Sequence, residues 1–386
     1  MNILVCLTYY RPHYSGLTIY AERLARALVD AGHQVTVVTS RYDSRLPMDT
    51  MQDGVRVVRL NVAGRISKGV IMPAMPWRAF QLAKHADVIH LHLPQLDASY
   101  IALMARLMGK PVLLTYHCDL VLPRGLVHKA ANLGSHLANH ISAIAANVIV
   151  TNTGDYAEHS PFLRHYLGKV QVIQPPVELP AVSEDDLAQL RAKAGVGLDE
   201  KIIVMAARLA TEKGVEYLVQ AMPAVLEKHP KARVLFVGQY ENVVGEQAYA
   251  LKLAPLIEQL GKAWTFLGVL SPTELAAVYH LAEVLVLPSI NSTESYGMVQ
   301  VEAMSCGTPV VATDLPGVRQ PVAMTSMGLV VPPQDSSALA KAIKTVLDNP
   351  QRYRGDALAV AKRFSSKTIA SQYMLIYEKL VGNRKS

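Results

Sequence analysis

The 386-residue sequence contains few cysteines and no long apolar run. Its three cysteines, Cys6, Cys118 and Cys306, are scattered and show none of the spacings typical of metal or redox sites. No segment approaches the ~20 apolar residues that a bilayer-spanning helix needs. The opening residues MNILVCLTYY lack the basic start of a signal peptide and are typical of a buried strand. These absences favour a reduced, cytoplasmic, globular protein.

The basic residues are unevenly distributed along the chain. Residues 1–180 hold 17 Lys and Arg against 11 Asp and Glu, together with 11 of the 13 histidines. The asymmetry suggests that the first half meets an anionic partner. No nucleic-acid-binding motif and no basic-aromatic interleaving is found, which argues against nucleic acid. An anionic membrane surface or a phosphate-bearing acceptor fits better, and an ordinary solvated surface is the alternative.

Both halves of the chain alternate short apolar runs with helical patterns, which predicts two α/β domains with parallel sheets. A single core rarely extends over a chain of this length. The proline-rich segment 174–180 breaks both patterns and is predicted to be the linker, so the domains are expected at 1–176 and 185–364. Strands are expected at residues 3–7, 34–39, 55–60, 88–91, 112–116, 148–151, 170–173, 202–206, 233–238, 264–267, 284–288, 310–313 and 328–331.

The segment PSINSTESYGMVQVEAMSCGTPVVAT, residues 288–313, carries two glutamates eight positions apart. An apolar strand leads into a polar loop with Glu294, Gly297 opens a helix, and Glu302 is expected about two turns into that helix. Loop amides and a helix N-terminus can hold phosphate, and carboxylates can accept hydrogen bonds from pairs of hydroxyls. The segment therefore predicts a nucleotide-sugar pocket. The alternative is two solvated glutamates near a helix start, where the helix dipole favours acids.

A second chemical signal is AARLATEKGVEYLVQAM, residues 206–222. Arg208 and Lys213 fall in the loop between a strand and a helix. Two cations beside a helix N-terminus can neutralise a diphosphate as it leaves. A surface arginine and a helix-starting lysine are the alternative interpretation.

Together these segments resemble the donor-site signature of the family 4 glycosyltransferases, which are retaining enzymes of the GT-B fold. The shared features are the Glu-x7-Glu spacing, the glycine three residues after the first Glu, the Gly-Thr-Pro-Val-Val ending, and Arg208 followed by Lys213-Gly214, with Ala207 replacing the family's usual glycine. The resemblance implies two Rossmann-like, doubly wound parallel-sheet domains facing a central cleft. It also implies that a C-terminal helix, about residues 365–386, crosses back onto the first domain.

By this resemblance the chain is expected to be a retaining glycosyltransferase of the hexosyltransferase type. Its donor is expected to be a uridine or guanosine diphosphate sugar. The expected acceptor is a lipid-linked glycan, a glycolipid or a surface polysaccharide precursor. No cofactor is expected, and no metal either, because the Asp-x-Asp pair that metal-dependent sugar transferases use is absent. No carboxylate of the first domain stands out as a nucleophile, which agrees with attack by the acceptor on the same face as the leaving group.

The resemblance also implies roles for individual donor-site residues. Arg208 and Lys213 would stabilise the departing diphosphate, Glu294 would bind sugar hydroxyls, and Glu302 would bind the ribose diol. Backbone near the strand end at 266–270 would hold the nucleobase. The remaining donor-binding residues expected from the resemblance are Val269, Leu270, Tyr296, Gly297, Met298 and Val299.

In the first domain, the strand of LLTYHCDL, residues 113–120, delivers His117 to its carboxyl end, where doubly wound sheets bind ligands. The resemblance implies that His117 contacts and orients the donor sugar. Asp119, two residues further on, is a weaker candidate for this site. Gly16, in the loop PHYSG, is expected near the donor phosphate and sugar because glycine lets the backbone approach; the family commonly has two glycines there. The aromatic residues crowding this loop are possible acceptor contacts: Tyr9, Tyr10, His13 and Tyr14.

Three alternatives remain open at this stage. The chain could be a GT-B-fold sugar phosphorylase, or a non-catalytic nucleotide-sugar-binding partner of another transferase. Residues 125–145 form a helical stripe of Leu126, Ala130, Leu133, Leu137, Ile141 and Ile144. Such a basic amphipathic helix can lie on an anionic membrane, but packing of the stripe on the first-domain sheet is the expected arrangement.

Overall fold

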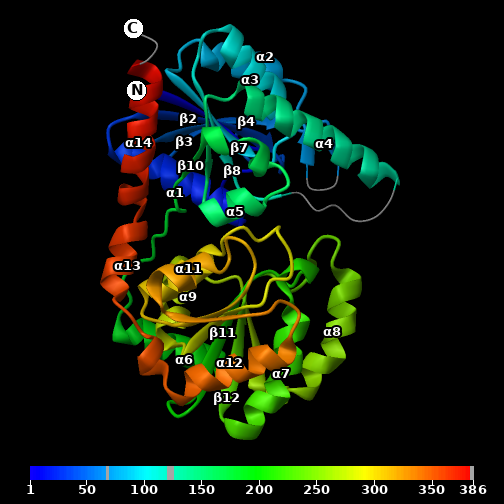
Figure 1. Ribbon diagram of the computed structural model, residues 1–386, viewed down its shortest axis with the longest axis vertical. Helices are drawn as coiled ribbons and strands as arrows, with labels where there is room; N and C mark the ends of the chain where they lie inside the picture. The colour runs from blue at the N-terminus through cyan, green and yellow to red at the C-terminus, as the bar shows by residue number, and fades with distance from the viewer. Residues whose placement is uncertain (67–68, 120–125, 383–386) are drawn as a thin grey trace. The chain divides into compact units, whose positions relative to one another are not determined.

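The computed structural model describes residues 1–66, 69–119 and 126–382, and it divides the chain into two units (Figure 1). Unit 1 comprises Met1–Pro176 and Phe364–Ser386, and unit 2 comprises Val177–Arg363. Each unit has a parallel sheet with helices packed on it and a hydrophobic core of its own. The two parallel-sheet α/β units predicted from the alternating pattern are therefore confirmed.

The sheet of unit 1 has the strand order β10-β9-β8-β7-β1-β2-β4-β3. All pairs are parallel except β3 with β4. The strand order reverses between β1 and β7, so the carboxyl ends of these two strands form the topological switch point where such sheets bind ligands. The strands are β1 (Asn2–Cys6), β2 (Gln34–Arg41), β3 (Asp49–Gln52), β4 (Val55–Asn61), β7 (Val88–Leu93), β8 (Val112–Tyr116), β9 (Val148–Thr151) and β10 (Val170–Val172).

A short hairpin and several helices complete unit 1. Helix α1 begins at Gly16 because Ser15 caps it: the Ser15 hydroxyl accepts from the Thr18 amide at 3.2 Å, and the Thr18 hydroxyl accepts from the Ser15 amide at 2.8 Å. The remaining elements are β5 (Gly64–Ile66), β6 (Gly69–Ile71), α1 (Gly16–Asp30), α2 (Met75–Ala83), α3 (Ala98–Leu107), α4 (Leu126–Ala145), α5 (Gly154–His159), the 3-10 turns Leu163–His165 and Leu167–Lys169, and α14 (Ser366–Gly382).

The C-terminal helix α14 packs against α1 within unit 1, although unit 2 precedes it in the chain (Figure 1). Tyr373 of α14 is fully buried, and its hydroxyl lies 2.6 Å from the Tyr20 hydroxyl and 3.0 Å from Thr115 Oγ1. One turn further on, the Tyr377 hydroxyl lies 2.8 Å from His90 Nδ1. Burying a polar group without a hydrogen bond costs free energy, so these bonds stabilise the packing of α14 against α1, β7 and β8.

The sheet of unit 2 is entirely parallel, with the order β13-β12-β11-β14-β15-β16. Its switch point lies between β11 and β14. The strands are β11 (Lys201–Ala206), β12 (Ala232–Val237), β13 (Trp264–Gly268), β14 (Val284–Leu287), β15 (Val310–Thr313) and β16 (Gly328–Val331). The helices are α6 (Glu184–Ala194), α7 (Val215–Lys228), α8 (Gln247–Gln259), α9 (Pro272–Leu281), α10 (Met298–Ser305), α11 (Gln320–Thr325), α12 (Ser336–Asp348) and α13 (Ala357–Phe364), with 3-10 turns at Thr211–Lys213, Gly261–Ala263 and Pro350–Tyr353.

One packing expectation is wrong. The side chains of α4 are described from Gly134 onward, and there Leu137 and Ile144 are 61% and 63% exposed, whereas Asn139 and Ser142 are buried. These two members of the apolar stripe therefore do not pack on the sheet. Leu126, Ala130 and Leu133 lie outside the residues whose side chains are described.

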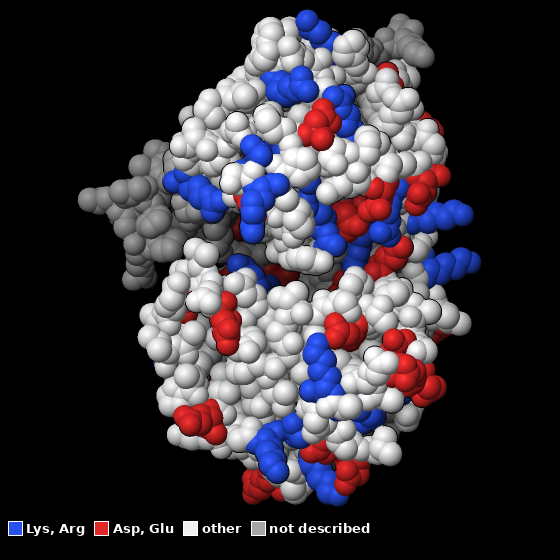
Figure 2. Space-filling model, turned by 180° about the vertical axis from the view of Figure 1, so that it is seen from behind, with Lys and Arg blue, Asp and Glu red and all other residues white. Residues whose placement is uncertain are grey.

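The structure also shows three short strands that the sequence pattern did not reveal, namely β3 and the hairpin strands β5 and β6. Strand β3, DTMQ, is exposed on one face and only partly buried on the other, and it has no apolar run, so nothing in its sequence marks it. In the described part of the chain, no helix is long and apolar enough to cross a bilayer. Over the face in Figure 2, Lys and Arg side chains are interspersed with acids and with broad uncharged areas.

Substituting Tyr373→Phe tests how α14 is held. The change leaves the ring in place but removes a hydroxyl bonded to Tyr20 and Thr115, so the free energy of unfolding unit 1 should fall by roughly 1–3 kcal/mol. Hydrogen exchange of unit 1 strand amides measures this without assuming two-state behaviour. Leu375→Ala, on the exposed face of the same helix, should change it by less than about 0.5 kcal/mol; equal losses would contradict the role of the hydroxyl.

Candidate active site

The predicted donor residues of unit 2 lie on two loops that leave the switch point. β11 and β14 are neighbouring parallel strands, and their carboxyl ends therefore lie at the same edge of the sheet. The loop after β11 carries Arg208 and Lys213, and the loop after β14 carries Glu294. The topology thus brings two segments more than 80 residues apart in sequence to one edge.

A close backbone approach holds these two loops together. Gly214 has φ +64°, and a Cβ at this position would lie 2.1 Å from the Pro288 carbonyl oxygen, so only glycine fits. The Ile290 amide donates to the Glu212 carbonyl oxygen at 3.1 Å. The loop after β11 therefore lies directly against the loop after β14.

This contact places Lys213 Nζ 2.6 Å from Glu294 Oε2. Both side chains are mostly buried, with 21% and 16% of their surface exposed. A charge pair in such a setting is attracted strongly, but removing one partner leaves the other poorly solvated. Arg208, on the same loop, pairs with Glu212 at 3.1 Å and is more exposed. Two cations and two acids thus line this edge.

Gly297 sets the start of α10. It has φ +79°, and a Cβ there would lie 2.3 Å from Leu287 Cδ2 and 2.9 Å from Gln300 Nε2. Gln300 is fully buried and its amide nitrogen donates to the carbonyl oxygens of Tyr296, at 2.7 Å, and Val318, at 2.9 Å. The loop and the helix N-terminus are therefore rigidly held.

The helix begins at Met298, so Glu302 is its fifth residue. The expectation that Glu302 lies about two turns into the helix is wrong: it lies little more than one turn in, because Gly297 is the N-cap. Glu302 is buried and accepts a hydrogen bond from the Tyr279 hydroxyl at 3.2 Å. This bond orients the carboxylate one turn from the helix N-terminus.

Of the other predicted donor residues, some have buried side chains and others have exposed ones. The Tyr296 ring is buried, and burial raises the pKa of its hydroxyl, so its backbone is the part that a ligand could reach. Met298 and Val299 form the first turn of α10, whose amides have no partner within the helix. Val269 and Leu270 follow β13 directly, and the Val269 side chain is exposed.

In unit 1, His117 follows β8 and lies against Tyr20 of α1, with the two rings edge to face at 4.9 Å. Burial lowers the pKa of His117 to about 3, so its imidazole is neutral at physiological pH. Gly16 is the first residue of α1. Ser15, which precedes Gly16, has a structural function because its hydroxyl and amide form the capping bonds with Thr18.

Other first-domain candidates have structural roles. Asp119 is buried and accepts hydrogen bonds from the hydroxyls of Tyr116, Tyr156 and Ser160 at 2.7–2.9 Å, so its carboxylate holds the loop after β8. Tyr10 is buried in the core, while Tyr14 is exposed. Aromatic rings lie together at this edge of the sheet: Tyr9 and His13 stack at 4.5 Å, and Tyr42 lies edge-on to both.

The structure adds residues that the sequence reasoning missed. His92 lies at the end of β7, with Nδ1 2.9 Å from His117 Nε2. The signal was present: in VIHLHL, residues 88–93, His90 and His92 are two apart, and side chains two apart on a strand share a face. Arg59 is 1% exposed, donates to the Arg11 carbonyl oxygen at 2.9 Å, and forms no ion pair among the described residues. No short sequence pattern marks it.

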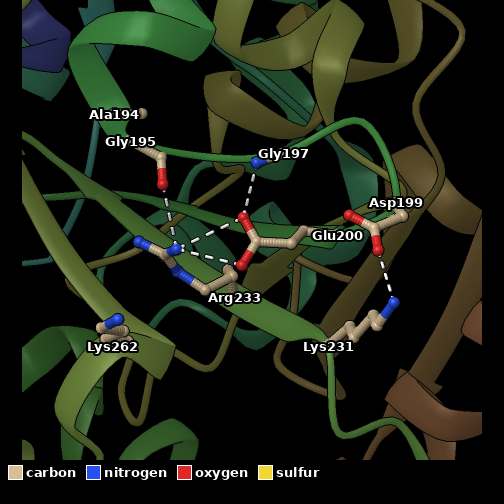
Figure 3. Close-up of a pocket in the computed structure, with 8 residues that line it drawn as sticks. All are labelled: Ala194, Gly195, Gly197, Asp199, Glu200, Lys231, Arg233 and Lys262. Atoms are coloured by element: carbon tan, nitrogen blue, oxygen red, sulfur yellow. Dashed lines mark hydrogen bonds and ion pairs between the residues drawn. The ribbon is translucent and has the colours of Figure 1, made fainter.

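Unit 2 also has a hollow of about 560 Å³, drawn in Figure 3, that is not the candidate site. Its lining residues precede β11, β12 and β13, except Arg233, which is the second residue of β12. The hollow therefore lies at the amino ends of these strands, opposite the switch-point edge that binds ligands in such sheets. Four of its five charged side chains form two ion pairs: Arg233 pairs with Glu200, and Lys231 pairs with Asp199. Its position at the amino ends of the strands distinguishes it from the candidate site, whose two cations are also in ion pairs.

Comparison with known sequences identifies relatives over most of the chain. The family model described as "Glycosyl transferase 4-like domain" matches residues 15–174, and "Glycosyl transferases group 1" matches residues 187–362. D-inositol 3-phosphate glycosyltransferase 1 of Catenulispora acidiphila is 30% identical, over 95% of this chain and 91% of that protein. Phosphatidyl-myo-inositol mannosyltransferase of Mycobacterium leprae is 28% identical, over 94% and 92%.

Solved structures share the fold. Sucrose-phosphate synthase of Thermosynechococcus elongatus superimposes with a TM-score of 0.76 over 99% of both chains, at 24% identity. HepE of Anabaena, in complex with UDP and glucose, gives 0.76 over 98% of this chain and 100% of that one, at 22% identity. At these identities the likeness establishes the architecture.

Gly297→Ala tests the packing at the start of α10. The left-handed backbone alone costs a residue with a Cβ roughly 1–2 kcal/mol, and the overlap with Leu287 and Gln300 adds to it. Gly268, with φ +70° and open space around it, is the matched control: Gly268→Ala should show the backbone cost alone. Chemical denaturation followed in unit 2 measures both; an equal loss would mean that the loop yields to the added methyl group.

Proposed function

The chain belongs to glycosyltransferase family 4 and has the GT-B fold, and we propose that it transfers a sugar from a nucleoside diphosphate sugar, with retention of configuration, to an anionic lipid-linked acceptor. The observation that carries the proposal is the Lys213–Glu294 pair at the switch point of unit 2. Through this pair, a cation and a carboxylate lie together in the loops that precede helices α7 and α10.

The proposed donor site is built for a diphosphate. Lys213 and Arg208 supply positive charge, and the first turn of α10 supplies amides and the positive end of a helix dipole. Glu302, oriented by Tyr279, would accept from the ribose hydroxyls. HepE of Anabaena is described with UDP and glucose, and the Mycobacterium leprae relative is named a mannosyltransferase; uridine and guanosine nucleotides are therefore the donors to test.

In the proposed reaction, the bond between the anomeric carbon and the diphosphate oxygen breaks, and its electron pair leaves on the diphosphate. Lys213 and Arg208 stabilise the charge that develops there, which is the largest electrostatic demand of the step. The acceptor hydroxyl oxygen bonds to the anomeric carbon on the same face, and its proton passes to the departing phosphate oxygen. Neutral His117 orients the sugar through its hydroxyls. Because both cations come from the chain, we propose that no metal is required.

The proposed acceptor is anionic and is presented at a membrane surface. Buried Arg59 forms no ion pair among the described residues; it donates to the carbonyl oxygens of Arg11 and Pro47 and to Gln52 Oε1, and its charge acts on Tyr42. A buried cation that has neutral acceptors but no acidic partner is stabilised further by an anion that approaches it. The relatives named above act, by their names, on inositol phosphate and phosphatidylinositol compounds, and both kinds of compound carry phosphate.

The outer faces of α3 and α4 carry the features of a membrane-docking surface. Leu107 is 90% exposed, and Leu137 and Ile144 are exposed as well. Arg106 Nη1 donates to the Ala145 carbonyl oxygen at 3.4 Å, so the C-terminal ends of α3 and α4 lie side by side. Residues 98–154 contain four Lys and Arg but a single acid, which is the buried Asp119. Exposed leucines with basic neighbours bind anionic bilayers.

Lys213→Ala and Glu294→Ala should each lower the rate of sugar transfer by roughly two to three orders of magnitude while leaving the fold intact. Removing Lys213 withdraws a charge from the leaving diphosphate, and loss of such a preorganised group costs roughly 10²–10³-fold in kcat. Transfer to a glycolipid extract with radiolabelled donors measures the rate. Lys231→Ala, which breaks the exposed Lys231–Asp199 pair at the opposite edge, should leave it unchanged.

Near-normal rates in either site variant would overturn the site assignment. Donor binding without turnover in the unaltered protein would instead indicate a non-catalytic partner of another transferase. Turnover that requires free phosphate would indicate a phosphorylase.

The double substitution Leu107→Glu with Ile144→Glu should weaken binding to phosphatidylglycerol vesicles by roughly tenfold or more, since each buried leucine or isoleucine contributes about 1.5–3 kcal/mol. Co-sedimentation measures the bound fraction, with phosphatidylcholine vesicles as the uncharged comparison. Leu198→Glu with Leu358→Glu, at similarly exposed positions of unit 2, is the matched control. Unchanged binding would exclude this surface as the docking face.

A further inference from the structure

The loop that follows β7 contains a buried glutamine whose side-chain amide forms no hydrogen bond. Gln95 is 5% exposed, and neither its Nε2 nor its Oε1 has a partner among the described residues. The large majority of buried polar side-chain atoms in proteins are bonded, so an amide that is unpaired at both ends needs an explanation. Burying such a group without a bond destabilises the fold. Packing alone therefore does not account for a glutamine at this position.

Gln300 of unit 2 shows how a glutamine with a structural function is bonded. It is fully buried, and its amide nitrogen donates to the carbonyl oxygens of Tyr296, at 2.7 Å, and Val318, at 2.9 Å. These bonds join the loop before α10 to the segment before α11. The amide of Gln95 joins no two segments in this way within the described part of the chain.

Gln95 lies at the switch point of unit 1. It is the second residue after β7, and the strand order of the sheet reverses between β7 and its parallel neighbour β1. The same loop lies close to the end of β1, because the charge of Asp97, in addition to burial, raises the pKa of Cys6, the last residue of that strand. Doubly wound sheets bind ligands at such a point. Gln95 is therefore placed where a ligand of unit 1 is expected.

The loop can turn the amide of Gln95 outward at little cost. Leu96, the next residue, is 37% exposed, so the loop lies at the protein surface. Asp97 is the N-cap residue of α3, but its side chain makes no capping bond. The Ala98 amide donates to the Gln95 carbonyl oxygen at 3.4 Å, which is long for such a bond. Turning the side chain of Gln95 breaks none of its hydrogen bonds, and segments with few bonds open most easily.

We propose that Gln95 binds two neighbouring hydroxyl groups of the acceptor, and that residues 94–97 turn its amide toward them. One hydroxyl can donate to Oε1 while the other accepts from Nε2, so a diol satisfies both ends of the amide. An ionised phosphate or carboxylate only accepts and would leave Oε1 unpaired. The inference rests on the proposed function and deepens it: the acceptor is a polyhydroxylated compound that a neutral group recognises in addition to charged ones.

Gln95→Met tests whether the amide serves a ligand rather than the fold. Methionine is similarly long and unbranched and has no strong donor or acceptor to satisfy. Hydrogen exchange of the slowest strand amides of unit 1, without donor or acceptor, should therefore slow by roughly 5-fold or more. Gln300→Met is the matched control: it leaves two buried carbonyl oxygens unpaired, so exchange in unit 2 should accelerate by a similar factor. Unchanged or faster exchange in Gln95→Met, or its failure to fold, would overturn the inference.

Kinetics give the second readout. With the two hydrogen bonds lost, Gln95→Met should raise the apparent KM for the acceptor in a glycolipid extract by roughly 5- to 30-fold, with the KM for the donor unchanged. Gln34→Met, at an exposed position at the amino end of β2, should change neither.

An unchanged acceptor KM in Gln95→Met would overturn the inference, while the transfer observed would still support the proposed function. Absence of transfer by the unaltered protein would instead refute the proposed function, and the inference with it.

Discussion

The arrangement of unit 2 depends on the close contact between the loops that leave β11 and β14. Neighbouring parallel strands bring their carboxyl ends to one edge, and Gly214 lets the first loop lie on the Pro288 carbonyl. From this contact follow the Lys213–Glu294 pair, its partial burial and its position near the N-terminus of α10. A residue with a Cβ at position 214 would separate the loops and the charges with them.

The two units present different electrostatics at their switch points. Unit 2 combines charged side chains with a helix N-terminus, which suits an anion such as diphosphate. Unit 1 keeps its central groups neutral: burial lowers the pKa values of His90 and His117 to about 3, and the tyrosines of α14 complete their hydrogen bonds. In the proposed function, the charged edge of unit 2 serves the leaving diphosphate, and the neutral histidines of unit 1 serve the sugar hydroxyls.

Much of this could be predicted from the sequence. The strands were found because parallel strands buried on both faces are continuous apolar runs, and the loop residues were found because their spacing resembles a known signature. The exposure of Leu137 and Ile144 on α4 was not predicted. Periodicity identifies an apolar stripe on a helix but does not tell which part of the protein covers that stripe. The His92–His117 pair depends on which strands are neighbours, and Arg59 on how two loops fold over it; neither is a local property.

The most direct test of the account is calorimetric titration of uridine and guanosine diphosphate sugars, with and without EDTA, into the unaltered protein and Arg208→Ala. The account predicts that one donor binds equally well with and without EDTA, and that Arg208→Ala loses most of that affinity. Binding that disappears in EDTA would contradict the assignment of the diphosphate to Arg208, Lys213 and the α10 N-terminus. Binding that is unaffected by Arg208→Ala would contradict the role of Arg208 in that site.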